Sequence, residues 1–238
     1  MIYTGTASWR LLKPIQAQFP GEGTHLARYA RRLPAVEVNS SFYRHHRRTQ
    51  YAKWASEVSE DFRFAVKLPR WLSHDQRLRG HEGLDDFLEE VHGLGDRLGP
   101  LLVQLPPSLD FEEEEVGGFL EALREHFDGG VVCEPRHSGW FDGRADELLA
   151  RFSVSRAAAD PPPVAGADEP GGWGGRVYLR LHGRPQRFYS AYTDAFLDQL
   201  AGNLPSRAGH AETWCIFNNT ASEAGIENAL ALHGRLTS

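Results

Sequence analysis

Polar side chains follow several short apolar runs of this chain, and they are of the types that carry acid–base and anion-binding chemistry. Three pairs of them are spaced two residues apart, which in an extended strand places both side chains on one face. These pairs are Glu37 with Asn39, Glu134 with Arg136, and Arg180 with His182. Carboxylates and imidazoles exchange protons, and guanidinium groups bind carboxylates or phosphates through parallel hydrogen bonds. The pattern predicts a site that binds an anion and acts on it by proton transfer.

The candidate residues divide by chemistry into catalysts and ligand-binding groups. Three residues are candidate acid–base catalysts: Glu37, Glu134 and His182. Eight more are candidate ligand-binding residues: Asn39, Lys67, Gln104, Arg136, His137, Asp160, Arg180 and Asn219. Among them, Lys67, Arg136 and Arg180 are the cations expected to hold the anion, because guanidinium forks match carboxylate and phosphate geometry. His137 is a second candidate for moving protons.

Several of these residues also have a purely structural interpretation. Lys67 and Glu134 could form a buried ion pair that only locks the fold together. Asn39 and Asn219 could cap the helices that follow them, which is a common use of asparagine. His137 could be a solvated loop residue. The sequence leaves these alternatives open.

The chain carries side chains that bind divalent metals, but their expected surroundings are cationic. The ligand types are Glu37, Glu134, Asp160 and His182. Lys67 and two nearby arginines would repel a cation, so we expect no tight metal site. The sequence also lacks a Walker loop, a Gly-x-Ser-x-Gly elbow, a His-Glu-x-x-His motif and a Gly-x-Gly-x-x-Gly motif. We therefore expect neither a metal nor another cofactor.

A basic segment, Arg44-His45-His46-Arg47-Arg48, raises the alternative of a nucleic-acid partner. Arg44, Arg47 and Arg48 could hold a phosphate backbone, and aromatic side chains in neighbouring loops could stack on a base. The whole chain has a formal net charge of −6, so it lacks the overall basic footprint of a duplex-binding domain. A solvated loop is the structural alternative for this segment.

The elements that must position these residues alternate between short β-branched runs and longer amphipathic ones. The eight short runs cover residues 2–6, 35–38, 62–66, 101–104, 131–134, 155–159, 176–180 and 213–217. Their ends lie about thirty residues apart, which is the size of one βα unit. Eight such units predict an α/β fold, a single TIM-type (β/α)₈ barrel domain over residues 1–238. In such a barrel the loops after the strands meet at one mouth, where the polar residues would gather.

Helices are expected between the strands in all but one unit. The predicted helices cover residues 24–32, 51–58, 83–94, 112–127, 146–152, 192–204 and 221–236. The exception follows the sixth strand, where Pro161-Pro162-Pro163 and Gly171-Gly172-Trp173-Gly174-Gly175 occur. Proline lacks a backbone donor and glycine loses too much entropy to hold a helix interior. An irregular loop is therefore predicted in place of that helix.

Composition excludes several classes of protein. Of 238 residues, 41% are hydrophobic and 24% charged, which is unlike disordered, collagen-like or coiled-coil chains. Cys133 and Cys215 are too few for a disulfide framework. The sequence shows no signal peptide and no apolar run of the roughly 20 residues that a membrane span needs. We expect a cytoplasmic protein that does not bind membranes.

Five motifs in this order resemble the YecE-like family, domain of unknown function 72. They are Val36-Glu37-Val38-Asn39-Ser40-Ser41-Phe42-Tyr43, Phe64-Ala65-Val66-Lys67, Gln104-Leu105-Pro106-Pro107, Glu134-Pro135-Arg136-His137 with Trp140, and Arg180-Leu181-His182-Gly183. The resemblance runs from Gly5 to about Leu232. It implies a single-domain TIM-type barrel with polar residues at one mouth, and it implies no reaction. Ala7-Ser8-Trp9 departs from the family pattern, in which Gly-Trp is expected near the first strand end.

The residues and the resemblance together favour a barrel that binds an anionic, phosphate- or carboxylate-bearing small molecule. Acid–base catalysis on that molecule is the associated hypothesis. The alternatives are a nucleic-acid processing or binding barrel and a non-catalytic metabolite-binding protein. The oligomeric state does not follow from the sequence.

Overall fold

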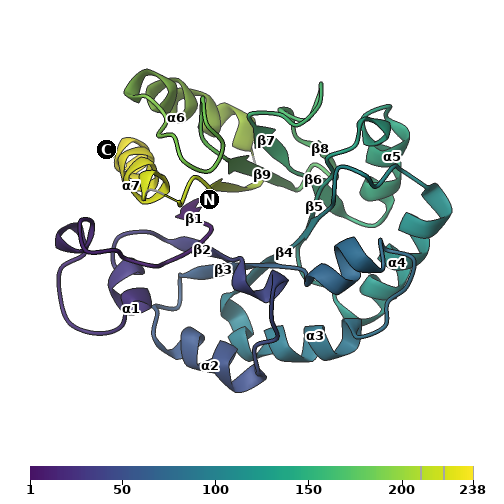
Figure 1. Cartoon of the computed structure of the whole chain (residues 1–238), viewed down its shortest axis with the longest axis horizontal. Helices are drawn as coiled ribbons and strands as arrows, with labels where there is room; N and C mark the ends of the chain where they lie inside the picture. The colour runs from purple at the N-terminus through teal and green to yellow at the C-terminus, as the bar shows by residue number, and fades with distance from the viewer. Residues whose placement is uncertain (210, 222, 238) are drawn as a thin grey trace.

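The strands form one mostly parallel sheet that curls into a nearly closed barrel, and the helices surround it (Figure 1). The computed structural model describes residues 1–209, 211–221 and 223–237. The strands are β1 Ile2–Thr6, β2 Ala35–Val38, β3 Arg63–Lys67, β4 Leu98–Gln104, β5 Val131–Glu134, β6 Val154–Arg156, β7 Ala158–Asp160, β8 Gly171–Gly172, β9 Arg176–Leu181 and β10 Glu212–Phe217. The helices are α1 His25–Tyr29, α2 Arg48–Ser56, α3 Leu84–Val91, α4 Glu113–His126, α5 Arg144–Arg151, α6 Asp194–Ala208 and α7 Ala224–Thr237. The predicted α/β barrel is confirmed.

The predicted sixth strand is divided into two short strands at Ala157. The first part, β6, pairs with β5, and the Ala157 amide still donates to the Cys133 oxygen of β5 at 2.8 Å. From Ala158 onward the chain pairs with β9 instead, as β7. The run from residue 154 to 160 therefore joins the two ends of the sheet and brings the barrel close to closure. A single uninterrupted strand here was a wrong prediction.

The irregular loop predicted after Asp160 is confirmed, and it contains a strand of its own. Gly171 and Gly172 form β8, which pairs antiparallel with β6. Glycine is required at 172, because φ is +65° and a Cβ atom would lie 2.6 Å from the Val154 oxygen. Arg156 fixes the loop by donating to the backbone oxygens of Gly166 and Glu169.

Alternation along the strands separates two hydrophobic layers. Outward-facing residues such as Val177, Leu179 and Cys215 pack against the helices in the larger core. Inward-facing residues form a smaller cluster inside the barrel, built around Trp214 and Tyr178 with alanines on the facing strands. Trp214 fits because β4 has glycine at residue 99, where a Cβ atom would lie 2.7 Å from the indole ring.

Helix ends follow the expected capping chemistry. The Thr24 hydroxyl accepts a hydrogen bond from the Ala27 amide at the start of α1, and Thr193 accepts one from Phe196 at the start of α6. Glu113 and the two glutamates after it lie in the first turn of α4, where negative charge is favourable. No helix in the described part of the chain has both the length and the apolar character needed to cross a membrane.

Candidate functional site

A cavity of about 520 Å³ opens where the strands end, at the mouth predicted to carry the site. Five of the predicted site residues line it: Asn39, Lys67, Gln104, Arg136 and Arg180. Each comes from a different strand end, and the register aligns these ends, with Gln104 beside Glu134 for example. The remaining lining residues are Phe42, Tyr43, Arg70, His74, Pro106, Pro107, Phe188, Asn218, Thr220 and Ala221.

Two carboxylates and two guanidinium groups form a network under the floor of this cavity. Glu37 of β2 accepts hydrogen bonds from Arg180 Nε at 3.0 Å and Nη2 at 2.7 Å, and from the Tyr178 hydroxyl at 3.0 Å. Glu134 binds the remaining Arg180 nitrogen, Nη1, through Oε2. Its other oxygen accepts from Arg136 Nε and Nη2 at 3.0 and 2.9 Å. Arg180 therefore joins carboxylates from opposite parts of the barrel wall.

The network is stable only as a set of paired charges. Arg180 is 1% exposed and both carboxylates are fully buried. Burial alone would raise the pKa of Glu134, but the charges of Arg180 and Arg136 outweigh it and hold that pKa well below its usual range. Burial likewise opposes the charge of Arg180, and Glu134 and Glu37 more than compensate. Glu134 is therefore an anion at neutral pH.

Lys67 lies beside this network without joining it. The ion pair between Lys67 and Glu134 that the sequence allowed is absent, because Glu134 binds Arg180 and Arg136 instead. The Lys67 ammonium nitrogen lies 3.8 Å from the centre of the Phe42 ring. Burial and the charge of Arg180 lower the pKa of Lys67 from 10.5 to about 7, although Glu37 and Glu134 act in the opposite direction. Near neutral pH, Lys67 can therefore gain or lose a proton.

His182 connects the network to the cavity wall. The amide nitrogen of Asn218 lies 3.1 Å from Nδ1 of His182 and can only donate, so Nδ1 accepts this bond. The proton of the neutral ring is then on Nε2, which lies 3.6 Å from Glu134. Burial lowers the pKa of His182. The imidazole is therefore neutral at pH 7, and its Nε2 atom faces Glu134.

Asn39 carries a polar atom for which the fold provides no partner. It begins the short helical turn Ser40–Phe42, but its side chain makes no capping hydrogen bond. Its amide oxygen is buried and has no hydrogen-bond partner among the described residues. Asn39 lies between the main cavity and a neighbouring one of about 310 Å³ that is lined by Glu37 and Arg44. The capping interpretation of Asn39 is therefore wrong, and the residue contributes to the walls of both cavities.

Three predicted ligand-binding residues lie away from the cavity. His137 accepts the Gly139 amide and lies 2.9 Å from Asp110, so it shapes the loop after β5. Asp160 pairs with Arg184 and accepts from the Tyr192 hydroxyl. These four interactions order loops rather than the pocket.

Asn219 is the third of these residues, and it is fully buried. Its amide nitrogen donates to the Ser190 oxygen at 2.9 Å and to Asn228 of α7 at 3.1 Å. Asn228 also binds both the amide and the oxygen of Tyr192. Asn219 therefore helps to join the loops after β9 and β10 to α7.

The basic segment is partly neutralised by α3. Arg48 pairs with Glu89, and His45 lies 3.1 Å from Glu90. Arg44 and Arg47 are exposed. A nucleic-acid partner for this segment stays a prediction.

His74 and Asn218 are cavity residues to which the sequence argument gave no role. His74 follows β3 in the π-helical turn Trp71–Asp75, and its ring packs edge-on against Phe42 with centres 4.9 Å apart. Burial and the nearby charge of Lys67 lower the pKa of His74 to about 4. His74 lies seven residues after Lys67, and no strand or short-loop periodicity connects the two positions, so no signal in the sequence pointed to it. Asn218 could have been found, because it directly follows β10.

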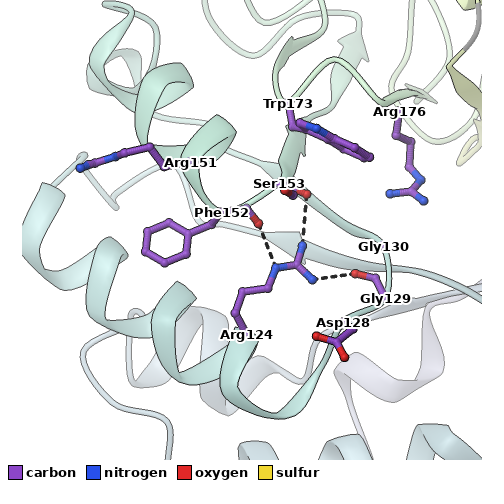
Figure 2. Close-up of a pocket in the computed structure, with 9 residues that line it drawn as sticks. All are labelled: Arg124, Asp128, Gly129, Gly130, Arg151, Phe152, Ser153, Trp173 and Arg176. Carbon is purple, nitrogen blue, oxygen red and sulfur yellow. Dashed lines mark hydrogen bonds between the residues drawn. The ribbon is translucent and has the colours of Figure 1, made fainter.

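A second cavity of about 460 Å³ lies at the opposite end of the barrel, where β5, β6 and β9 begin (Figure 2). Arg124 of α4 lies across it and donates to four backbone oxygens at 2.7 to 3.1 Å, those of Phe127, Gly129, Phe152 and Ser153. Arg176 binds Glu212 at 2.8 Å. None of the predicted site residues lines this cavity, and this end of a barrel generally serves stability. Within the described residues, no cluster of three histidine, cysteine or acidic side chains fits a metal at either end.

Comparisons with known proteins find chains that are similar to this one in sequence. The model of the family described as "Protein of unknown function DUF72" matches residues 3–238. UPF0759 protein YecE of Escherichia coli strain K12 is 32% identical over 174 residues, which is 70% of this chain and 62% of the relative. UPF0759 protein YunF of Bacillus subtilis is 26% identical over 201 residues, 77% of this chain and 71% of that protein.

The barrel also matches a crystal structure of a DUF72 family protein from Thermotoga maritima. The TM-score is 0.82 at 22% sequence identity, and the match covers 100% of both chains. This likeness is one of fold. Because the family model spans nearly the whole chain, the protein belongs to the DUF72 family.

Proposed function

We propose that the cavity at the strand ends binds an anionic small molecule that carries a phosphate or carboxylate group. The observation that supports this is the charge of its lining. Four lining residues are basic, namely Lys67, Arg70, Arg136 and Arg180, and no carboxylate lies among the described lining residues. Glu37 and Glu134 beneath the wall offset two of these charges, and Asp75 pairs with Arg70. Lys67, Arg136 and Arg180 together therefore carry one positive charge more than their two buried partners when Lys67 is protonated. A wall with such an excess attracts anions and repels cations.

The anion is expected to bind closest to Arg136 and Lys67. Each of the three guanidinium nitrogens of Arg180 already binds Glu37 or Glu134, so we assign Arg180 to holding the wall rather than to binding the ligand. Arg136 is 21% exposed and binds Glu134 through Nε and Nη2, and among the described residues no hydrogen bond from its Nη1 is found. Asn39 and Gln104 add amide groups on the same wall.

Acid–base chemistry on this anion would use the groups whose protons can move near neutral pH. Lys67, with a pKa of about 7, is the first of these. His182 is held in one tautomer between Asn218 and Glu134 and can relay a proton. Glu37 and Glu134, the carboxylates predicted as catalysts, serve in this proposal mainly as the counter-ions that fix Arg180.

Calorimetric titration with phosphate, sulfate, citrate and a sugar phosphate tests the proposal, with a neutral sugar as the comparison. We expect Arg136→Gln to weaken anion binding by about 10- to 100-fold, because a charge-assisted hydrogen bond contributes about 1.5–3 kcal/mol. Arg144→Gln is the matched control, because Arg144 is exposed, pairs with Asp142 and does not belong to the described lining of the cavity. Equal affinities for Arg136→Gln and the parent protein would overturn the proposal. Salt-sensitive retention on heparin that is lost in Arg44→Gln with Arg47→Gln would instead support a nucleic-acid partner.

A further inference from the structure

We propose that Lys67 is a nucleophile that forms a Schiff base with the carbonyl group of an anionic oxo compound. The inference rests on the proposed function, because it assumes that Arg136 and the cationic wall hold the acidic group of the same molecule. It adds a covalent step and a substrate class, namely a short-chain 2-oxo acid or a keto-sugar phosphate.

The first support is the position of the amine. Lys67 is the last residue of β3, so its side chain starts at the mouth of the barrel. The residue is 6% exposed, its side chain lies against Phe42, and it lines the 520 Å³ cavity. A lysine that served only as a structural cation would be expected to have a carboxylate partner. Both nearby carboxylates are already bound by arginine.

The second support is the state of the amine in this position. A lysine attacks a carbonyl carbon only when it is neutral, and burial next to other cations favours the neutral form. Arg180 and Arg136 supply that positive charge, and the pKa of Lys67 falls to about 7. At pH 7 about half of such amines are neutral, against roughly one in 2,500 for an exposed lysine with a pKa near 10.4.

The third support is a histidine that contacts the same aromatic ring, Phe42. The Ser73 hydroxyl donates its only proton to the Pro69 oxygen at 3.0 Å, so its contact with His74 must be a hydrogen bond from Nδ1–H of His74 to the hydroxyl oxygen. Nε2 of His74 then carries no proton and can accept one. His74 lines the same cavity as Lys67, and Phe42 contacts both of them.

The step balances without a redox partner. The Lys67 nitrogen forms a bond to the carbonyl carbon, and the carbonyl π electrons move to oxygen, which takes up a proton to give a carbinolamine. His74 relays both protons that nitrogen loses, the first to the carbonyl oxygen and the second to the departing hydroxyl group, and its pKa of about 4 means that it holds each proton only briefly. Water leaves and the C=N bond forms, so the net change is amine plus carbonyl to imine plus water.

Reduction with sodium borohydride tests the proposal, because it converts an imine into a stable secondary amine. The protein is incubated at pH 7 with pyruvate, with dihydroxyacetone phosphate or with acetone, reduced, and mapped by peptide mass spectrometry. The adduct adds the mass of the carbonyl compound minus one oxygen atom. We expect it on Lys67 with one of the two anionic compounds, and which of them reacts identifies the acidic group.

The chain offers a close internal control, since it contains only three lysines, Lys13, Lys53 and Lys67. Lys13 and Lys53 are exposed. We expect at least about tenfold more adduct on Lys67 than on either of them, given the difference in neutral fraction. Lys53→Arg should retain the adduct and Lys67→Arg should lose it, with equal melting temperatures showing that both variants fold. His74→Gln should slow adduct formation on Lys67.

The outcomes separate this inference from the proposed function. Calorimetric binding of pyruvate or dihydroxyacetone phosphate without an adduct on Lys67 would overturn the Schiff base and leave anion binding intact. Absence of any anion binding, together with absence of adduct, would overturn both. An adduct spread evenly over Met1, Lys13, Lys53 and Lys67 would also overturn the inference, because it would show ordinary surface reactivity. Equal trapping of acetone and the anionic compounds would show that Arg136 does not hold the acidic group, and it would overturn the proposed substrate class.

Discussion

Arg180 binds two buried carboxylates that come from strands far apart in the sequence. Glu37 and Glu134 would each be an uncompensated charge without it, and a buried unpaired charge costs far more free energy than an exposed one. The same residue lowers the pKa of Lys67. One side chain therefore determines both how the barrel mouth is held and how its amine behaves.

Replacement of Arg180 by methionine is expected to destabilise the protein by about 3–5 kcal/mol, because it leaves two carboxylates buried without their common partner. Urea denaturation at pH 7 measures this change in the free energy of unfolding. Adding Glu37→Gln to Arg180→Met should restore part of the loss, since one stranded charge is then removed. A double variant that loses the sum of the two single losses would contradict this account.

Replacement of Lys67 by methionine is expected to stabilise the protein below pH 7 by about 2 kcal/mol, because an unpaired buried cation is replaced by an apolar group. The pKa of Lys67 is about 7 in the fold against 10.5 when exposed. Between these values the unfolded chain binds a proton that the folded chain does not, so this group makes stability rise with pH. The advantage of Lys67→Met should therefore shrink between pH 7 and 10.5. Urea denaturation at pH 6 and pH 9 would contradict this if the difference stayed constant.

At the scale of elements, the run from residue 154 to 160 and the loop after it form the irregular part of the wall. Arg156 holds them together: it is buried, pairs with Asp146 of α5 at 2.7 Å and reaches two backbone oxygens of the loop. Its guanidinium group also lies over the Phe141 ring. The loop is therefore fixed by one side chain where other units have a helix.

Arg156→Met is expected to cost about 2 kcal/mol, because hydrogen bonds to charged groups contribute about 1.5–3 kcal/mol. It should also make residues 161–175 more sensitive to limited proteolysis, since the loop loses its attachment to α5. Mass spectrometry of the fragments locates the cleavage. Arg144→Met, an exposed neighbour on α5, should change stability by less than about 0.5 kcal/mol. Equal cleavage of both variants would argue against the role given to Arg156.

The sequence predicted the elements better than the contacts between side chains. Strand ends and helices followed from local periodicity, which acts over a few residues, and the loop followed from proline and glycine chemistry. The partners of Glu134 did not follow, because the choice between Lys67 and Arg180 depends on how far each side chain reaches across the barrel. Asp160 and His137 illustrate the same limit. Asp160 ends β7 and His137 follows β5, yet contacts within the local loops turn both side chains away from the cavity.

At the scale of the whole molecule, the two cysteines lie in the layer between barrel and helices. Cys133 is on β5 and Cys215 on β10, and both are buried. Burial raises the pKa of each thiol. Neither can react as a thiolate while the barrel is intact.

Labelling with a thiol reagent should therefore report unfolding of the barrel. We expect no fast reaction of the native protein and simultaneous labelling of Cys133 and Cys215 as urea unfolds it, because strands of one closed sheet lose protection together. Mass spectrometry counts the labels at each urea concentration. Labelling of Cys133 well before Cys215 would show instead that the wall near β6 opens on its own.

The interrupted strand at Ala157 also leaves a seam in the ring of backbone hydrogen bonds around the barrel. A cylinder whose strands are paired all the way round resists widening evenly, because every ladder must stretch at once. Here the chain changes partners from β5 to β9 at Ala157, so the ladder of backbone hydrogen bonds round the barrel is interrupted at this seam. Arg180 lies on the β9 side of it, in register with Ala159. The ion pair between Arg180 and Glu134 of β5 therefore spans the seam, and any widening of the mouth at this place must separate two buried charges.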